Sequence, residues 1–500
     1  MNKVTAVLQF HSQSNRERVI QPLIQSPLIE RVIIMYDDTF ASPFPKCEGI
    51  KSPSLTYGKV LNNLIKKIRT DFLLILTRAQ EIDIPRGTLE RLVDVAEATD
   101  AGIVYSDYLE NVNGHISEHP LNDYQLGSIR DGFDFGNMML FSIPAIKQAL
   151  KKYGAIPDVK YAGLYDLHLK VAIDRHPFHI QEFLYTKVHS KSELNKGREL
   201  REGHFDYVDP GNQAVQKEME EIATGYLKNI GAYLKPRFTK IPVSKHKYPV
   251  EASVVIPVRN RARTIMHAVH SAISQETDFS FNVIVVDNHS TDGTTALLAD
   301  MAKHNHAVKH IIPSRFDLSI GGCWNEAIFS DICGRYAIQL DSDDLYSSPE
   351  TLQKIINMFR TGDYAMVIGS YTIVNEQLEE IPPGLIDHRE WTDDNGRNNA
   401  LRINGLGAPR AFDTGLLRNV CFPNVGYGED YAVALRVSRE YRIGRIFENL
   451  YLCRRWAGNT DAALSIEKNN RNDAFKDKIR TIEIRARQKF NRSKIISSSD

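Results

Sequence analysis

Short apolar runs alternate with amphipathic segments along most of the chain. In the second half, Ser253–Pro257 is a β-rich run, residues 264–273 have apolar positions at helical spacing, and Phe281–Val286 is a second buried strand. A further helix is predicted after this strand, with Asp292 or Thr294 as its cap. Strands and helices that alternate in this way predict an α/β fold with a mostly parallel, doubly wound sheet. Ligands of such sheets bind beyond the carboxyl ends of the strands, so the residues after each strand are the first candidates for chemistry.

The two halves of the chain resemble each other. Val32–Asp38 and Val283–Asn288 are both apolar runs that end in a polar pair. A later pairing matches Asp166 with Asp430 at the start of a helical segment. The period of about 250 residues predicts a duplicated domain, because the repeats of solenoid proteins are far shorter.

The same pattern divides the chain into four parts. We predict a first domain over residues 1–205, a helical linker over 206–249, a second domain over 250–465 and a basic helical tail over 466–500. In the linker, a stretch with helical apolar spacing is followed by a connector that contains prolines. The tail is polar and rich in Lys and Arg, which predicts a solvated helix or, alternatively, a segment that binds a membrane surface or a partner.

The loops after the first two strands of the second domain are candidates for nucleotide binding. Pro257-Val258-Arg259-Asn260 begins a loop that carries three arginines within residues 257–263. Asp287 ends the second strand, where a carboxylate can accept hydrogen bonds from a base or a ribose. Each loop could instead be an ordinary polar turn, in which Asp287 and its neighbours make an Asx turn and cap the next helix.

Three carboxylates follow the third strand. Asp341-Ser342-Asp343-Asp344 comes directly after the apolar run Tyr336–Leu340. Clustered carboxylates at the edge of a buried sheet repel one another unless a cation compensates, and carboxylate oxygens suit Mg²⁺ or Mn²⁺. Asp341 and Asp343 are therefore the candidate metal ligands, and the cation could bridge to a diphosphate. The alternative is a solvated acidic turn before a helix.

An acidic pair follows a glycine-rich turn later in the chain. Glu429 and Asp430 come after Gly426-Tyr427-Gly428 and begin an amphipathic helix. One of them could be a general base that deprotonates an incoming hydroxyl. Alternatively, acidic residues favour a first helical turn because the helix dipole is positive there.

Composition narrows the class of protein. The 500 residues contain 62 Lys+Arg and 62 Asp+Glu, so the zero net charge argues against a bulk polyanion such as nucleic acid as a partner. Five cysteines without a C-x-x-C pair argue against a disulfide scaffold or a thiolate zinc site and fit a reducing compartment. The N-terminus lacks the apolar segment of a signal peptide, and no apolar run approaches the roughly 20 residues that span a bilayer. We therefore expect a cytoplasmic protein without a transmembrane segment.

With these loops in order, the second half resembles a family 2 glycosyltransferase of the GT-A fold, over roughly Glu251–Ser465. Five strings carry the resemblance: Val255–Arg261, Val285–Thr294, Asn325–Ala327, Asp341–Asp344 and Gly428–Asp430. One departure is Asp287-Asn288-His289-Ser290, where the family commonly has Asp-Asp-Gly-Ser. The first half resembles the same fold more weakly, so the resemblance implies two tandem GT-A-like domains with a helical linker.

The resemblance implies a site. In the family, the residue matched by Asp287 contacts the nucleotide base. The residues matched by Asp341 and Asp343 hold the ribose and a divalent metal, Mn²⁺ or Mg²⁺, and the residue matched by Asp430, next to Glu429, is the catalytic base. Further residues that the resemblance implies in donor binding are Pro257, Val258, Arg259, Asn260 and Asn325, with Arg454 and Arg455 as candidates for the diphosphate.

The resemblance also implies a reaction and partners. A sugar would pass from a nucleotide-sugar donor to an acceptor hydroxyl in one displacement with inversion, by positioning and electrostatic stabilisation. The implied acceptor is a glycan or a lipid-linked glycan in the synthesis of a bacterial polysaccharide or surface glycan. A homodimer and a peripheral association with the inner face of a membrane are left open. Trp456 either lines the acceptor side or belongs to the core.

The first half lacks most of these carboxylates. Thr77-Arg78-Ala79-Gln80 stands where the second half has Asp341-Ser342-Asp343-Asp344, and Asp166 stands at the place matched with Asp430. We therefore predict a degenerate domain without transferase activity, which contributes to acceptor binding or dimerisation.

Two other functions compete with sugar transfer. A sugar-nucleotide pyrophosphorylase also uses a nucleotide-binding α/β sheet and a divalent metal. It would need a glycine-rich loop with a lysine after the first strand, and Pro257–Asn260 lacks the glycines. A non-catalytic carbohydrate-binding scaffold suits the first half, whereas Asp341, Asp343 and Asp430 argue against it for the second.

Overall fold

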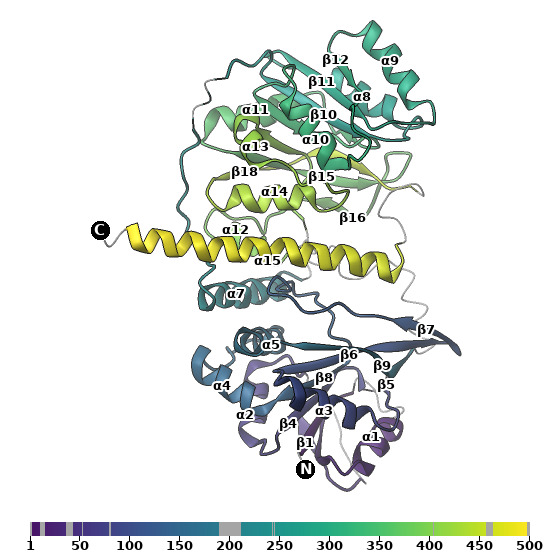
Figure 1. The fold of residues 1–500 in the computed structure, drawn as a ribbon, viewed down its shortest axis with the longest axis vertical. Coiled ribbons are helices and arrows are strands. Elements are labelled where there is room, and N and C mark those ends of the chain that lie inside the picture. The colour runs from purple at the N-terminus through teal and green to yellow at the C-terminus, as the bar shows by residue number, and fades with distance from the viewer. Residues whose placement is uncertain are drawn as a thin grey trace. The chain divides into compact units, whose positions relative to one another are not determined.

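The chain folds into two compact units in the computed structural model (Figure 1). The structure describes residues 3–10, 16–36, 44–52, 54–79, 82–189, 212–242, 244, 246–403, 405–456 and 464–497. The first unit comprises Met1–Asp206, Gly211–Tyr233 and Ser465–Asp500, and the second comprises Tyr207–Pro210 and Leu234–Leu464. Each unit is built around one sheet.

The first unit has a nine-stranded sheet among its described residues. Its strands are β1 (Val4–Gln9), β2 (Ile29–Tyr36), β3 (Cys47–Lys51), β4 (Phe72–Leu76), β5 (Ile82–Asp83), β6 (Ile103–Val112), β7 (His115–His119), β8 (Met138–Ser142) and β9 (Phe178–His189). Its helices are α1 (Arg16–Gln25), α2 (Gly58–Lys67), α3 (Thr88–Thr99), α4 (Ile143–Tyr153), α5 (Gly163–Asp174), α7 (Gln213–Asn229) and α15 (Ile466–Ser497).

The second unit also has a nine-stranded sheet in its described part. Its strands are β10 (Ala252–Val258), β11 (Phe281–Asp287), β12 (Val308–Ile311), β13 (Tyr336–Gln339), β14 (Leu345–Tyr346), β15 (Met366–Val374), β16 (Glu380–Ile386), β17 (Arg410–Asp413) and β18 (Ile443–Arg454). Its helices are α8 (Ile265–Ile273), α9 (Thr294–His304), α10 (Ile320–Phe329), α11 (Thr351–Thr361), α12 (Gly396–Asn399), α13 (Thr414–Val420) and α14 (Glu429–Ser438).

The two sheets have the same strand order. It is β3-β2-β1-β4-β8-β6-β9-β5 in the first unit and β12-β11-β10-β13-β17-β15-β18-β14 in the second, with β7 beside β6 and β16 beside β15. The α/β class predicted from the sequence is confirmed, but the prediction of a mostly parallel sheet is wrong. In both sheets a strand, β8 or β17, runs antiparallel to both of its neighbours. The spacing of apolar runs does not reveal strand direction, so the sequence pattern could not show this reversal.

An individual contact also recurs at equivalent positions of the two units. Asn62 in α2 donates its side-chain amide to the carbonyl of Ile156 and accepts from the backbone N–H of the same residue. Asn325 in α10 makes the same two hydrogen bonds with Phe422. The shared strand order and this shared contact support the predicted duplication, which itself stays a prediction.

Both faces of the second sheet are covered by helices. Val254 and Ile256 of β10 pack in a core with side chains of α8 and α11. The intervening Val255 points to the opposite face, because side chains alternate along a strand, and it is also fully buried. Burial on both faces explains why the central strands are continuous apolar runs. It also leaves the ends of the strands as the places where polar side chains can gather.

The helices predicted as a linker and a tail belong to the first unit. Asp477 of α15 is fully buried and accepts hydrogen bonds from Ser128 (2.8 Å) and Arg130 (3.2 Å) of the first unit and from Arg480 (2.8 Å) of its own helix. The chain therefore returns to the first unit after completing the second, and α15 is more than a solvated tail.

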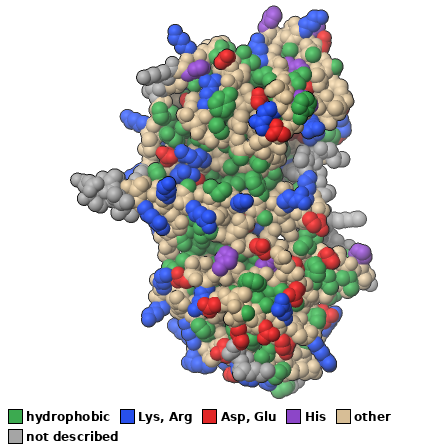
Figure 2. Space-filling model, viewed as in Figure 1, with side chains coloured by type: hydrophobic (Ala, Val, Ile, Leu, Met, Phe, Trp, Pro, Cys, Tyr) green, Lys and Arg blue, Asp and Glu red, His purple; other side chains and the backbone are tan. Residues whose placement is uncertain are grey.

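No helix in the described ranges is both long enough and apolar enough to cross a membrane. Figure 2 shows basic and acidic side chains scattered over the visible face of the molecule, in keeping with the zero net charge.

Candidate active site

Asp287 ends β11 and is fully buried. Its carboxylate accepts hydrogen bonds from the backbone N–H of Ser290 (3.0 Å) and the hydroxyl of Thr295 (2.5 Å), and Nε2 of His310 lies 3.5 Å away. Burial favours the neutral acid, but these hydrogen bonds outweigh it and lower the pKa of Asp287. A fixed negative charge is thus held at the carboxyl edge of the sheet.

The loops after β10 and β11 are joined by hydrogen bonds. The amide oxygen of Asn260 accepts from the backbone N–H of Thr291 at 2.7 Å. Asp292 accepts from the backbone N–H of Ala262 (3.0 Å) and from that of Thr294 at the start of α9 (3.1 Å). Asp292 therefore makes an Asx turn just before α9 and fixes the neighbouring arginine-bearing loop, whereas the N-cap of α9 is Gly293 and neither of the two predicted residues.

The segment Asp341–Asp344 follows β13 at the same edge of the sheet. Asp341 accepts a hydrogen bond from the side-chain amide of Gln339 at 3.0 Å. Asp344 is buried and accepts from the backbone N–H of Arg454 at 2.8 Å. Burial, together with repulsion from the neighbouring carboxylates, raises the pKa of Asp341 and of Asp344. The cost of burying these carboxylates close together thus outweighs the stabilisation that nearby cations such as Arg410 give to Asp341.

Cationic and aromatic side chains surround Asp343, whose side chain is 16% exposed. Arg261 Nε lies 3.9 Å from its carboxylate, and the indole N–H of Trp456 donates a long hydrogen bond of 3.4 Å to it. The guanidinium carbons of Arg261 and Arg263 lie 6.0 and 5.2 Å from the centroid of the Trp456 ring. Arg454 donates its Nε–H to the backbone carbonyl of Asp343. Two predicted groups, the carboxylates for a metal and an arginine for a diphosphate, thus lie side by side.

Glu429 and Asp430 form the first turn of α14. The side chain of Asp430 is 29% exposed, and its Oδ2 lies 2.7 Å from Nη2 of Arg410. Glu429 is buried, and burial together with the neighbouring Asp430 raises its pKa to about 8. At neutral pH Glu429 therefore carries a proton and cannot accept another.

Arg410 and Gln339 are site residues that the sequence pattern did not predict. The side chain of Arg410 is 13% exposed, and its Nη1, Nη2 and Nε donate to Gln339 Oε1, Asp430 Oδ2 and the carbonyl of Leu406, each at 2.7 Å. Gln339 in turn donates to Asp341. A continuous chain, Asp341–Gln339–Arg410–Asp430, thus joins the two carboxylate segments. One signal was available in the sequence: a lone Arg at the start of the otherwise apolar string Arg410-Ala411-Phe412.

Other predicted donor-binding residues have different surroundings. Pro257 and Val258 lie within β10, and Arg259 is exposed just beyond it. Arg455 follows β18 and donates its backbone N–H to the carbonyl of Val374 at 2.7 Å.

Asn325 makes a contact that belongs to the fold. Both its amide nitrogen and its amide oxygen bind the backbone of Phe422. Asn62 makes the same contact in the first unit. Asn325 thus contributes to the packing of α10, and its predicted role in donor binding stays a prediction.

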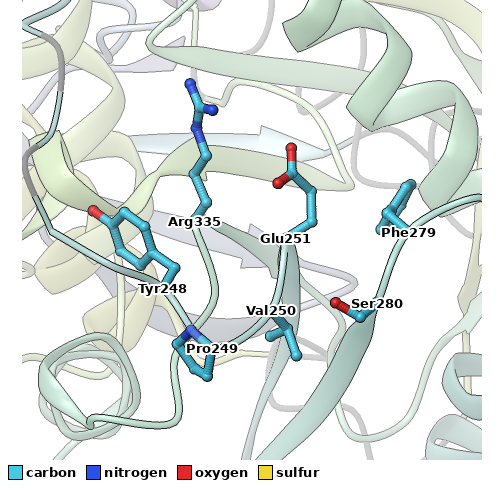
Figure 3. Close-up of a pocket in the computed structure, with 7 residues that line it drawn as sticks. All are labelled: Tyr248, Pro249, Val250, Glu251, Phe279, Ser280 and Arg335. Carbon is cyan, nitrogen blue, oxygen red and sulfur yellow. The ribbon is translucent and has the colours of Figure 1, made fainter.

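A pocket of about 380 Å³ lies away from these residues (Figure 3). Its lining includes Glu251, Ser280 and Arg335, which directly precede β10, β11 and β13. The pocket is therefore at the amino ends of the strands, whereas Asp287 and Asp341 lie at or just beyond the carboxyl ends. This position separates it from the candidate site.

The first unit has no carboxylate at the position equivalent to Asp430. Tyr165 and Tyr431 are the third residues of α5 and α14, and each is buried and donates its hydroxyl to a backbone carbonyl. This correspondence matches Leu164 with Asp430. The predicted match of Asp166 with Asp430 is therefore wrong by two residues.

Strand register matches the remaining site positions. β1 pairs with β4 as β10 pairs with β13, and β4 pairs with β8 as β13 pairs with β17. The matched pairs are Ile75 with Gln339 and Met139 with Arg410, and Thr77, two residues beyond Ile75, corresponds to Asp341. The first unit thus keeps the framework and carries no charge at any of these positions.

The Asp341–Asp344 segment fits a hard divalent cation in its chemistry. Its carboxylate oxygens are the ligands that Mg²⁺ and Mn²⁺ prefer, and a cation would relieve the repulsion described above. Within the described ranges, no group of three or more His, Cys, Asp or Glu side chains could hold a metal by itself. Asp341 and Asp343 would therefore need further ligands, such as the oxygens of a diphosphate.

Comparison with known proteins supports a relationship to enzymes that transfer sugars. The family model Glycosyl transferase family 2 matches residues 253–418. An uncharacterized glycosyltransferase of Haemophilus influenzae is 27% identical over 149 residues, which is 30% of this chain and 44% of that protein. An uncharacterized glycosyltransferase of Rickettsia conorii is 26% identical over 203 residues, 40% of this chain and 32% of that protein. The chain thus spans less than half the length of these curated relatives.

Two solved structures are similar in part. Residues 1–349 of Staphylococcus aureus TarS in complex with UDP-GlcNAc are 20% identical, with a TM-score of 0.36, over 46% of this chain and 70% of that chain. The mannosyltransferase PcManGT of Pyrobaculum calidifontis in complex with GDP-Man and Mn²⁺ is 16% identical, with a TM-score of 0.33, over 57% of this chain and 85% of that chain. The match to the family model includes Asp287, Asp341, Asp343 and Arg410, so the second unit of this chain is similar to family 2 of the glycosyltransferases over these residues.

Proposed function

We propose that the second unit transfers a sugar from a nucleotide-sugar donor to an acceptor hydroxyl, with inversion and with the help of a divalent cation. One observation carries the proposal: Asp341 and Asp430, far apart in sequence, are linked through Gln339 and Arg410. A metal-binding carboxylate and a partly exposed base joined in this way suit a displacement in which one holds the donor and the other activates the acceptor.

Each group has a role in this reaction. Asp341 and Asp343 would hold Mn²⁺ or Mg²⁺, which when bound supplies positive charge against the leaving diphosphate. Arg261 and Arg454 lie beside Asp343 and can bind diphosphate oxygens. Asp430 would take the proton of the acceptor hydroxyl as that oxygen attacks the anomeric carbon and the bond to the diphosphate breaks.

The base assignment favours Asp430 over Glu429. A general base must be ionised at the working pH and must reach the acceptor. Glu429 is buried and its pKa is raised to about 8, whereas the side chain of Asp430 is 29% exposed. Asp430 lies outside the residues that the family model matches, so its role rests on the contacts described above.

We further propose that the first unit does not transfer sugar. The uncharged residues at the positions matched with Gln339, Asp341, Arg410 and Asp430 support this; they are Ile75, Thr77, Met139 and Leu164. An acceptor such as a glycan or a lipid-linked glycan, and a place at the inner face of a bacterial membrane, fit the family but rest on the family resemblance alone.

A donor screen tests the proposal. The intact protein is incubated with Mn²⁺ and a panel of nucleotide sugars, and the release of nucleoside diphosphate is followed. The wild type should turn over at least one donor. Asp343→Ala and Asp430→Asn should each lower kcat by at least about 100-fold, in line with the loss of a charge-stabilising or general-base group.

A matched control is Asp300→Asn, because the Asp300 side chain is 75% exposed on α9. This variant should keep wild-type turnover. Normal activity in Asp430→Asn would contradict the base assignment. Substantial residual activity in both site variants would contradict the proposal that the first unit is inactive.

A further inference from the structure

Two of the four residues in the hydrogen-bonded series Asp341–Gln339–Arg410–Asp430 have no direct part in the proposed reaction. Gln339 and Arg410 lie on adjacent antiparallel strands, β13 and β17, and both are largely buried. A guanidinium presents its donors in a rigid, planar fork. Here the Nε, Nη1 and Nη2 positions each have an acceptor at 2.7 Å. The orientation of Arg410 is therefore fixed, and so is the carboxylate oxygen of Asp430 that it holds.

The fold does not require this polar pair. In the first unit, Ile75 and Met139 face each other in the matched register of β4 and β8, and both are buried. The same sheet therefore closes with two apolar side chains at this place. A buried charge and amide are costly compared with apolar residues of similar size unless every donor has a partner.

The polar pair occurs together with the carboxylates it joins. Where Gln339 and Arg410 are present, Asp341 and Asp430 lie at the two ends. Where Ile75 and Met139 replace them, Thr77 and Leu164 stand at those ends. The four polar residues are therefore present together in the second unit and replaced together in the first. This pattern indicates that they share a role in chemistry and not in folding.

We infer that Arg410 is a positioning residue, which holds the Asp430 carboxylate for proton transfer and, through Gln339, ties its position to Asp341 on the donor side. This inference rests on the proposed function. Arg410 acts through Asp430 and Asp341 and does not itself contact the reacting atoms. Its removal should therefore lower the rate of the chemical step more than the affinity for the donor.

The test compares Arg410→Met, Arg410→Lys and Gln339→Ile, with Met and Ile chosen because the first unit has them at the matched positions. Arg410→Met should lower kcat by at least about 100-fold while KM for the donor changes by less than about threefold. Arg410→Lys keeps the charge but not the fork, and should lower kcat by about tenfold. Donor binding, measured by calorimetry with Mn²⁺ present, should stay within about threefold of the wild type in all three variants.

Two further measurements separate positioning from simple damage. The double variant Arg410→Met with Gln339→Ile should lose no more kcat than Arg410→Met alone, because members of one chain are not additive. Arg445→Met is the matched control, since Arg445 of β18 donates to the backbone carbonyls of Ile368 and Asp387, which lie outside β13 and β17. It should keep wild-type kcat.

Each outcome decides the inference. A kcat within about threefold of wild type in Arg410→Met, a loss that appears in KM alone, or multiplied losses in the double variant would each overturn it. The proposed function fails in a different way, since the wild type would then release no nucleoside diphosphate from any donor.

Discussion

Glu429 offers a direct test of the electrostatics at the candidate site. Burial and the adjacent Asp430 raise its pKa from 4.5 to about 8 in the folded chain. Between these two pH values the folded state keeps a proton that the unfolded state has released. Stability from this group is therefore complete below about pH 4.5 and is lost as the pH rises towards 8.

The expected magnitude follows from the interval between the two values. Each pH unit corresponds to about 1.4 kcal/mol, so the loss between pH 4.5 and pH 8 is at most about 5 kcal/mol. Glu429→Gln keeps the shape of the side chain but does not titrate. The variant should match the wild type near pH 5 within about 1 kcal/mol, and should be more stable by several kcal/mol at pH 8 to 9.

Tryptophan fluorescence can isolate the relevant transition. The three tryptophans, Trp324, Trp391 and Trp456, all belong to the second unit, so urea unfolding followed by their emission reports on that unit. Glu448→Gln is the control, because the side chain of Glu448 is 66% exposed and should show no such pH dependence. Identical pH profiles for wild type and Glu429→Gln, or a variant that is less stable at pH 8, would refute the reasoning.

Two further predictions concern folding. Asp477→Ala should destabilise the first unit by about 3–5 kcal/mol, because it leaves Arg130 without a buried carboxylate partner; thermal unfolding should show the loss, and an unchanged Tm would contradict it. Asn325→Ala and Asn62→Ala should each lower the free energy of unfolding by about 1–3 kcal/mol, measured by urea unfolding, while KM for the donor stays unchanged. A rise in KM for Asn325→Ala alone would show that Asn325 binds the donor.

Local sequence patterns were sufficient to predict some parts of the site. Asp287 and Asp341 end or follow apolar runs, and a polar residue after a buried strand must lie at the sheet edge whatever the rest of the fold does. The α/β class follows from the alternation of apolar runs typical of strands with segments of helical apolar spacing. These inferences depend only on residues that are close in sequence, so they can be made without knowledge of the tertiary structure.

The parts that could not be predicted depend on long-range register. Arg410 and Gln339 are 71 positions apart, and their contact exists because β17 enters the sheet in reverse between β13 and β15. Local periodicity carries no information about that insertion. The contact of Asn325 with Phe422 could not be predicted for a similar reason, because it joins residues 97 positions apart.

The ion pair between Arg410 and Asp430 in the second unit has an evolutionary consequence. Loss of Arg410 alone would leave the Asp430 carboxylate without its cation. Gain of an aspartate at Leu164 alone would place a charge against the apolar core of the first unit, on which Leu164 packs. Such intermediates are unfavourable, because an unpaired charge in a largely buried place costs several kcal/mol. Single substitutions are thus hindered in both directions, so a unit with the apolar set does not readily acquire the charged set one residue at a time.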